Sequence, residues 1–354
     1  MHVPLLGRIG LAGDACDRRL TWTLVALALA LYTLGYAAFY PRAATNDDEG
    51  FYLEQTRLWV ETGSFVTEKI DPRSGEREPF VPGDYPIGMV ALMAPFVKAF
   101  GWRGAFFPSF LCLVVAVLVT ARWLHEERRS PAFALILLAF PAATVAGRLA
   151  MSDVARTAFA ALGLWWFFRG LDGHKSFWLA SGFVAGAALT LRESAVLPFL
   201  PLFAGTVLRR DRGWIWLLLG GLAGTALHLV TNQLAFGDAF FVRGASNPYH
   251  LDVGTIHQRL PLYLLGLLVL VPGGLAFGLA YRGRRRPEIV ATIVLYVSFY
   301  LFQGFGMLET GFVKRLWNGL RYFDPLLPVL AFAMAESTPQ LLEGWLVRRS
   351  QRAR

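Results

Sequence analysis

Long apolar runs separated by short polar segments follow one another along most of the chain. Their hydrophobicity is continuous rather than alternating, which is typical of membrane-spanning helices and not of the strands of a β-barrel. A spanning helix needs about 20 mainly apolar residues, so some of the runs are short, as helices packed inside a bundle often are. The runs that predict spanning helices are 20–40, 105–121, 131–147, 154–168, 177–191, 194–208, 214–235, 262–281, 289–306 and 321–336.

The composition agrees with an all-α polytopic membrane protein. Hydrophobic residues make up 55% of the chain and charged residues only 17%, below the quarter or so that is usual in soluble domains. The net charge of +9 comes mostly from arginines in short clusters between the apolar runs, which is the positive-inside pattern of membrane proteins. A basic stripe that would follow a nucleic acid is not seen. We therefore expect contacts with membrane lipids and no nucleic-acid partner.

A further apolar run at 85–101 contains Pro86, Pro95 and Lys98, and the charge distribution decides how to place it. If this run lies in the interface as a juxtamembrane helix, about ten spans bring every dense basic cluster to the side of the N-terminus. If it crosses, the clusters from Arg122 to Arg286 fall on the opposite side. We therefore expect 85–101 not to cross and both termini to be cytoplasmic. The basic clusters are Arg8, Arg18 and Arg19; Arg122, Arg128 and Arg129; Arg169 and Lys175; Arg209, Arg210 and Arg212; Arg282, Arg284, Arg285 and Arg286; and Arg348, Arg349, Arg352 and Arg354.

This topology divides the chain into a cytoplasmic N-terminal tail at 1–19, a single transmembrane domain at 20–337 with an outer loop at 41–104, and a basic cytoplasmic tail at 338–354. The run at 20–40 is too long for the apolar core of a typical signal peptide, so we interpret it as an anchor. Cys16 and Cys112 lie in different environments and are expected to be free. The expected location is a bacterial inner membrane.

The tetrad Asn46-Asp47-Asp48-Glu49 comes just after the first apolar run and opens the outer loop. Three carboxylates at a bilayer surface repel one another and are costly, so binding or catalysis explains them most easily. A carboxylate at a membrane-facing cleft can take a proton from an incoming nucleophile as general base. The alternative, a solvated acidic start of the loop, stays open.

Asp153 lies between two apolar runs, at the end of the segment Arg148-Leu-Ala-Met-Ser-Asp153. An ionisable residue near the end of a membrane helix is a candidate for function. A second acid near the first would form a pocket for an acceptor hydroxyl or amine. The alternative is a helix N-cap, which Ser152 or Asp153 would also serve.

The predicted outer face includes Arg148, Arg192 and Arg321, against the positive-inside trend. Guanidinium groups match phosphate oxygens with paired hydrogen bonds. These arginines therefore predict a phosphate site, most strongly at Arg321. Ion pairs with neighbouring acids such as Glu193 and Asp324 are the alternative.

Five segments carry a family resemblance, in this order along the chain: Asp48-Glu49-Gly-Phe-Tyr52, Tyr85-Pro86-Ile87-Gly88, the spacing from Arg148 to Asp153, Asn232-Gln-Leu-Ala-Phe236-Gly237, and Arg321-Tyr322-Phe-Asp-Pro325-Leu-Leu-Pro328. Together they resemble the membrane glycosyltransferases of the GT-C fold. The likeness is to glycosyltransferase family 39, which holds the dolichyl-phosphate-mannose protein mannosyltransferases and the lipid A aminoarabinose transferase. Only one of the family's two prolines is present at 85–88, and the large C-terminal soluble domain of some members is absent from the sequence.

The resemblance implies a GT-C helical bundle whose large first outer loop carries juxtamembrane helices. It implies an inverting transfer of a sugar from a polyprenyl-phosphate donor at the outer face, to an acceptor that is a protein, a lipid or a glycan. Asp48 is the expected general base, with Asp47 or Glu49 assisting it. Asp153 would position the acceptor. Substrate contacts are expected from Tyr52, Arg148, Arg192, Arg321 and Tyr322.

Two alternatives remain open beside this interpretation. The first alternative is a divalent cation at Asp48 and Asp153. Many GT-C enzymes of this kind need no metal, whereas oligosaccharyltransferases of the same architecture use a divalent ion at their acids. The other is a transporter or flippase for a lipid-linked or anionic substrate, although mid-span ionisable residues and repeat symmetry are not clear in the sequence. Walker, Rossmann, GxSxG and CxxC motifs are absent.

Overall fold

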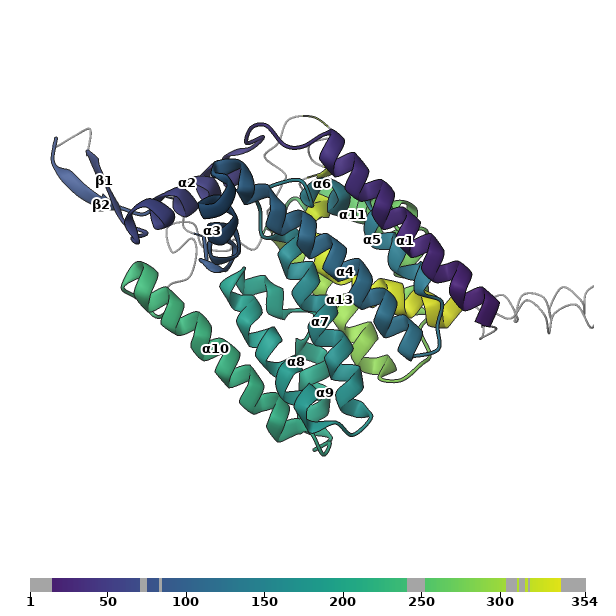
Figure 1. The fold of residues 1–354 in the computed structure, drawn as a ribbon. Coiled ribbons are helices and arrows are strands. Elements are labelled where there is room, and N and C mark those ends of the chain that lie inside the picture. The colour runs from purple at the N-terminus through teal and green to yellow at the C-terminus, as the bar shows by residue number, and fades with distance from the viewer. Residues whose placement is uncertain are drawn as a thin grey trace, which may run out of the picture.

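The computed structural model describes residues 15–70, 75–82, 85–240, 252–303, 311, 316–317 and 319–338. These residues form a bundle of helices that run roughly side by side, with two further helices and a hairpin across one end (Figure 1). The tail residues at 1–14 and 339–354 lie outside the described residues, and so do Arg8 and the basic cluster predicted at Arg348, Arg349, Arg352 and Arg354. The same holds for most of 304–318.

The first part of the chain forms one long helix and then the outer loop. Its elements are α1 (Ala15–Ala38), α2 (Asp47–Thr62), β1 (Thr67–Ile70), β2 (Arg77–Phe80), α3 (Gly88–Phe100), η1 (Trp102–Phe106) and α4 (Phe107–Glu126). The middle part contains η2 (Pro131–Leu135), α5 (Ile136–Ala139), α6 (Pro141–Ala146), α7 (Asp153–Leu171), α8 (Lys175–Ala187), η3 (Ala188–Thr190), η4 (Glu193–Val196), α9 (Leu200–Leu208) and α10 (Trp214–Phe236). The last part contains α11 (Ile256–Leu265), η5 (Gly266–Leu270), α12 (Gly274–Leu279), α13 (Arg286–Phe302), η6 (Arg321–Leu326) and a helix at 327–338.

Three helices of the described residues are long and apolar enough to cross a membrane: Arg19–Ala38, Trp102–Glu126 and Trp214–Phe236. The chain is therefore an integral membrane protein. Several other predicted runs form shorter or broken helices. The run 131–147 breaks at Phe140, whose extended backbone precedes Pro141 at the start of α6, because proline disfavours helical geometry in the residue before it. The count of about ten spans stays a prediction.

The outer loop contains a small antiparallel hairpin that the sequence analysis did not predict. Strands β1 and β2 pair with Thr67 opposite Phe80 and Ile70 opposite Arg77. The backbone of Gly75 before β2 has a φ of +74°, a conformation that glycine adopts readily. The all-α prediction therefore describes the bundle, and the hairpin is an addition to it.

Helix α3 occupies the run whose crossing was in doubt. It has 13 residues, fewer than the roughly 20 that a spanning helix needs. It packs against α2, and a separate apolar cluster that includes Tyr52, Tyr85, Met89 and Met93 lies beneath the loop. This packing holds α2 and α3 at one end of the bundle. Their position in the interface of a bilayer stays a prediction.

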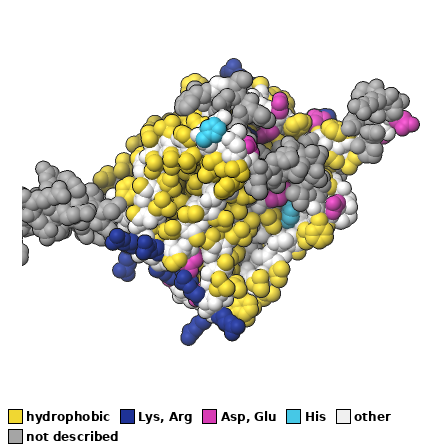
Figure 2. All heavy atoms as spheres, turned by 180° about the vertical axis from the view of Figure 1, so that it is seen from behind, with side chains coloured by type: hydrophobic (Ala, Val, Ile, Leu, Met, Phe, Trp, Pro, Cys, Tyr) yellow, Lys and Arg dark blue, Asp and Glu magenta, His cyan; other side chains and the backbone are white. Residues whose placement is uncertain are grey.

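Contacts between distant segments gather the basic clusters at the opposite end. The ring of Trp22 near the start of α1 lies 5.9 Å from the ring of His125 near the end of α4. An ion pair of 3.4 Å joins Arg169 to Glu126, and one of 3.0 Å joins Arg284 to Asp172. Further ion pairs at this end are Arg129 with Glu336 and Arg285 with Asp211. Figure 2 shows the visible Lys and Arg side chains concentrated at one end of the apolar body and most of the visible acids toward the other.

Candidate functional site

The start of α2 places Asp48 beside Arg321, although 273 positions separate them in the sequence. Asn46 caps the helix, since its side-chain oxygen accepts a 3.0 Å hydrogen bond from the backbone N–H of Glu49. One oxygen of Asp48 lies 2.9 Å from Nη2 of Arg321. The other accepts a hydrogen bond from the hydroxyl of Tyr85. The Asp48 side chain remains 28% exposed, while that of Arg321 is 8% exposed, so this ion pair opens to solvent on the Asp48 side.

Tyr85 is a member of the site that the sequence analysis named only as part of a motif. It is buried, and its ring lies 4.5 Å from that of Tyr52. The hydroxyl of Tyr52 donates a 3.1 Å hydrogen bond to Ser152. Tyr52 was predicted to contact substrate, but here it is buried and joins α2 to the turn before α7.

Glu49 is fully buried, in contrast with its two acidic neighbours. One carboxylate oxygen accepts a 2.8 Å hydrogen bond from the backbone N–H of Ala150, and the other a 2.6 Å bond from that of Thr45. The carboxylate therefore fixes the turn at 148–153 against the start of α2. Its predicted part in catalysis stays a prediction, and this geometry gives it a positioning role.

A second group of side chains surrounds Tyr322. The guanidinium carbons of Arg192 and Arg321 each lie 5.2 Å from the centre of its ring, a cation–π arrangement. The ring also stacks on Tyr300 at 5.2 Å. Arg192, Tyr322 and Arg321 form an Arg–Tyr–Arg group whose members are all largely buried, and Nε of Arg321 has no hydrogen-bond partner among the described residues. Two buried cations beside one ring repel each other, so this group favours an anion.

Asp153 is buried and forms an ion pair with Arg156, three positions on in α7. Arg156 is also buried, and its Nη1 lies 3.4 Å from both Ser194 and Tyr300. The sequence analysis missed Arg156, although a charged pair spaced i, i+3 inside an apolar helix is a signal for it. Ser152 occupies the N-cap position of α7 but makes no side-chain capping bond, and Asp153 pairs with Arg156.

Arg148 and Asp47 have other surroundings. Arg148 is half-buried, with its guanidinium carbon 6.0 Å from the ring centre of Phe39, the residue that follows α1. It is not brought to the Arg–Tyr–Arg group. Asp47 is exposed and lines an open pocket on another face of α2.

Asp324, which the sequence analysis considered only as an ion-pair partner, is fully buried at the start of the last helix. Neither of its oxygens has a hydrogen-bond partner in the described part of the chain. Arg156, Arg321 and Asp153 are its electrostatic neighbours. No sequence signal separates this carboxyl from an ordinary helix start.

Asp48 and Asp153 do not form a ready-made site for the divalent cation that was considered for them. Each carboxylate already has an arginine partner, Arg321 and Arg156 respectively. No cluster of three or more His, Cys, Asp or Glu residues suited to a metal occurs among the residues that the structure describes. Cys112 is free, while the side chain of Cys16 is not described.

Known proteins resemble this chain in part of its sequence and in most of its fold. Residues 84–232 match the family model of the dolichyl-phosphate-mannose-protein mannosyltransferases. Two crystal structures of ArnT from Cupriavidus metallidurans are similar. The apo structure has a TM-score of 0.59 at 20% identity, over 92% of this chain and 62% of that chain. The structure bound to undecaprenyl phosphate has a TM-score of 0.62 at 19% identity, over 93% of this chain and 63% of that chain.

This chain thus spans less than two thirds of the length of either ArnT chain. No curated protein sequence matches it. The family match includes Tyr85, Asp153 and Arg192, while Asp48 and Arg321 lie outside the matched residues. The predicted resemblance is confirmed: the chain has the GT-C fold of membrane glycosyltransferases, and its residues 84–232 match the family model of the dolichyl-phosphate-mannose-protein mannosyltransferases.

Proposed function

We propose that the protein transfers a sugar from a polyprenyl-phosphate donor to an acceptor at the outer face of the membrane. The acceptor oxygen forms a bond to the anomeric carbon while the bond from that carbon to the phosphate oxygen breaks. The acceptor proton goes to Asp48, and the polyprenyl phosphate leaves with the bonding electrons. Attack opposite to the leaving group inverts the anomeric centre.

The observation that carries this proposal is the pairing of Asp48 with Arg321. Transfer needs a base and a phosphate-binding cation close to the sugar's anomeric carbon, and this ion pair places one of each at the same opening. Tyr85 and Arg321 orient the carboxylate of Asp48, and its partial exposure leaves room for an acceptor hydroxyl. An incoming phosphate competes with Asp48 for Arg321, so donor binding frees the base.

The Arg192–Tyr322–Arg321 group supports the second half of the proposal. Charge develops on the phosphate as the sugar leaves, and preorganised cations in a site poor in water stabilise that charge most effectively. Both guanidinium groups are buried and close to one aromatic ring. The similar ArnT structure contains undecaprenyl phosphate, which agrees with a lipid-linked donor for this chain.

The distribution of charge between the two ends of the molecule supports the location of the site at the outer face of the membrane. The basic clusters meet at one end, and α2, α3 and the site lie at the other (Figures 1 and 2). Arginine and lysine favour the cytoplasmic side. On that basis the site faces outward and the start of α1 is cytoplasmic.

The test is donor consumption by the purified protein in nanodiscs. Radiolabelled polyprenyl-phosphate sugars of several kinds are supplied with envelope extract as acceptor. Asp48→Asn is expected to abolish transfer while donor binding is retained, because the amide cannot accept the proton. Glu61→Gln is the matched control, since Glu61 is an exposed acid at the far end of the same helix. Normal turnover by Asp48→Asn refutes the base assignment, and specific donor binding without turnover in the wild type favours the transporter alternative.

A further inference from the structure

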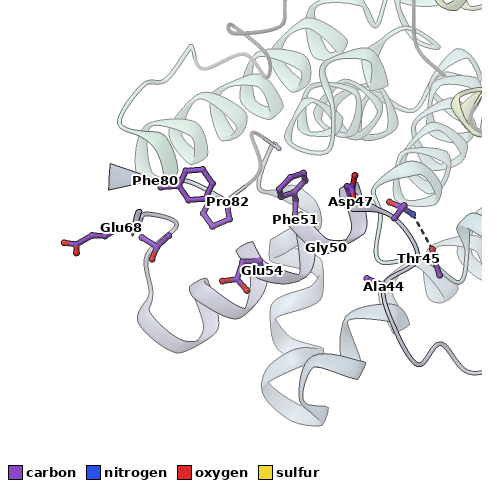
Figure 3. Close-up of a pocket in the computed structure, with 11 residues that line it drawn as sticks. Ala44, Thr45, Asp47, Gly50, Phe51, Glu54, Glu68, Phe80 and Pro82 are labelled. Carbon is purple, nitrogen blue, oxygen red and sulfur yellow. Dashed lines mark hydrogen bonds between the residues drawn. The ribbon is translucent and has the colours of Figure 1, made fainter. Parts of the chain in front are cut away.

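An open pocket of about 940 Å³ lies between α2 and the hairpin of the outer loop. One face of α2 forms its floor, with Asp47, Phe51 and Glu54 at helical spacing. Glu68, Phe80 and Pro82 close the other side. In Figure 3, Phe80 and Pro82 lie next to each other, beside the α2 residues Phe51 and Glu54. The volume is within the range of about 300–1,000 Å³ that is common for ligand pockets.

The lining combines flat apolar surfaces with hydrogen-bond acceptors, and the described residues that form it include no lysine or arginine. Two of its three carboxylates already have cationic partners outside the pocket: Glu54 lies 2.6 Å from Arg57, and Glu68 lies 3.2 Å from Arg77. These pairs leave little net charge, apart from Asp47. Hydrogen bonds from Arg57 lower the pKa of Glu54 despite its partial burial, so its carboxylate remains an acceptor. The lining therefore suits a neutral ligand with many hydroxyl groups better than an anion or a polycation.

The pocket is next to the proposed base. Asp47 and Asp48 are adjacent residues, so their α-carbons are about 3.8 Å apart. The ring of Phe51, which lines the pocket, lies 6.3 Å from the ring of Tyr85. The hydroxyl of Tyr85 in turn donates to Asp48. A ligand in this pocket has its end near the N-terminus of α2, where Asp48 is partly exposed.

We infer that this pocket binds the acceptor and that the acceptor is an uncharged saccharide. The apolar C–H faces of sugar rings pack on Phe51, Phe80 and Pro82, and sugar hydroxyls donate hydrogen bonds to the carboxylates of Asp47, Glu54 and Glu68. An anionic lipid headgroup would meet no cation among the described lining residues, and Asp47 would repel its charge. The role as acceptor site rests on the proposed transferase function; the binding of a saccharide does not.

Binding is therefore measured separately from transfer. The full-length protein in nanodiscs is titrated by saturation-transfer NMR with neutral hexasaccharides of glucose, mannose, galactose and N-acetylglucosamine, and with a matched set of uronic acid oligomers. At least one neutral oligosaccharide is expected to bind, and the uronic acid set is not. Phe80→Ala and Glu54→Gln should each raise its Kd about tenfold, equivalent to roughly 1.4 kcal/mol. Glu61→Gln, which removes the other acid paired with Arg57 but lies outside the pocket, should leave Kd unchanged.

The transfer assay gives the second readout. Phe80→Ala and Glu54→Gln should raise the KM for the saccharide acceptor and leave the KM for the donor unchanged. The inference is overturned if no neutral oligosaccharide binds, if the uronic acid oligomers bind better, or if binding survives both pocket substitutions. A further outcome separates the two proposals. If a saccharide binds in a Phe80-dependent way but no lipid-linked donor is consumed under any condition, the transferase function is refuted and the saccharide site is retained.

Discussion

Arg321 has two anionic partners to satisfy in the proposed mechanism, the carboxylate of Asp48 and the donor phosphate. In the structure it contacts Asp48 through Nη2, while its buried Nε has no hydrogen-bond partner within the described part of the chain. Lysine has no planar fork, so it would bind either partner only as a point charge, without paired hydrogen bonds. The arrangement at Arg321 therefore depends on guanidinium geometry as well as on charge.

The substitution Arg321→Ala is expected to lower kcat/KM for the lipid donor by about 10²–10³-fold, as for the loss of one donor to a developing oxyanion. Arg321→Lys should give an intermediate loss, because the charge remains without the paired geometry. Steady-state kinetics in nanodiscs measure both. The control is Arg122→Gln, which removes an exposed arginine at the basic end. Kinetics of Arg321→Ala that equal the wild type would reject its role at the phosphate.

The carboxylate of Glu49 can be interpreted as catalytic or as structural, and the two interpretations predict different effects of substitution. The sequence analysis predicts a part in catalysis, whereas the structure uses both oxygens to accept hydrogen bonds from Ala150 and Thr45. Removing the side chain leaves buried N–H groups unsatisfied, at a cost of about 1–3 kcal/mol for each such group. Glu49→Ala and Glu49→Gln should therefore lower the Tm in thermal unfolding, while Asp48→Asn should not. A Glu49→Gln protein with the wild-type Tm and no turnover would restore the catalytic interpretation.

Residue types were predictable from sequence, but residue partners were not. Asp48, Asp153, Arg192 and Arg321 stand out because charge in or near an apolar run is costly. Which arginine meets which acid depends on the packing of segments up to 273 positions apart. Asp153 forms an ion pair with Arg156, which was not among the predicted site residues. Arg148 instead lies beside Phe39, just after α1.

At the scale of elements, glycines set the contact between α8 and α10. A Cβ added to Gly220 would lie 2.0 Å from the carbonyl oxygen of Leu179, and one added to Gly186 would lie 2.4 Å from that of Gly221. Gly182 and Gly186 are four positions apart on α8, as are Gly220 and Gly224 on α10. Small residues at this spacing let membrane helices approach closely.

Gly220→Ala is expected to destabilise the bundle by about 1–3 kcal/mol, because the methyl group forces the two backbones apart. Thermal unfolding in nanodiscs measures this as a lower Tm. Gly221→Ala is a matched control on the same helix, since its added Cβ meets only one atom, at 3.9 Å. That substitution should keep or raise the Tm, because alanine is the better helix former by about 1 kcal/mol. Equal Tm values for the two variants would contradict the close packing.

Element positions were more predictable than element continuity. Apolar runs located the helices of the bundle, since burial in lipid or protein requires them. Hydropathy did not show where a run breaks, as at Pro141 or at Gly273, where φ is +69°. The hairpin was missed because two strands of four residues each carry little periodic signal.

At the scale of the whole molecule, charge divides the protein into two ends. Ion pairs connect segments from α4, α7, α13 and the last helix at the basic end, and the acidic start of α2 lies at the other. Surface ion pairs contribute little free energy of folding. Their common location matters more for membrane insertion, where the distribution of arginine and lysine sets the orientation.

The orientation leads to a prediction that does not depend on the substrate. After both native cysteines are replaced by serine, Thr62→Cys puts an exposed thiol at the end of α2, and Lys175→Cys puts one at the start of α8, at the basic end. A membrane-impermeant maleimide added to intact cells should label Thr62→Cys at once and Lys175→Cys only after permeabilisation. The opposite pattern would place the Asp48–Arg321 pair on the cytoplasmic side. A donor and acceptor would then have to meet there, and a transfer reaction at the outer face would be excluded.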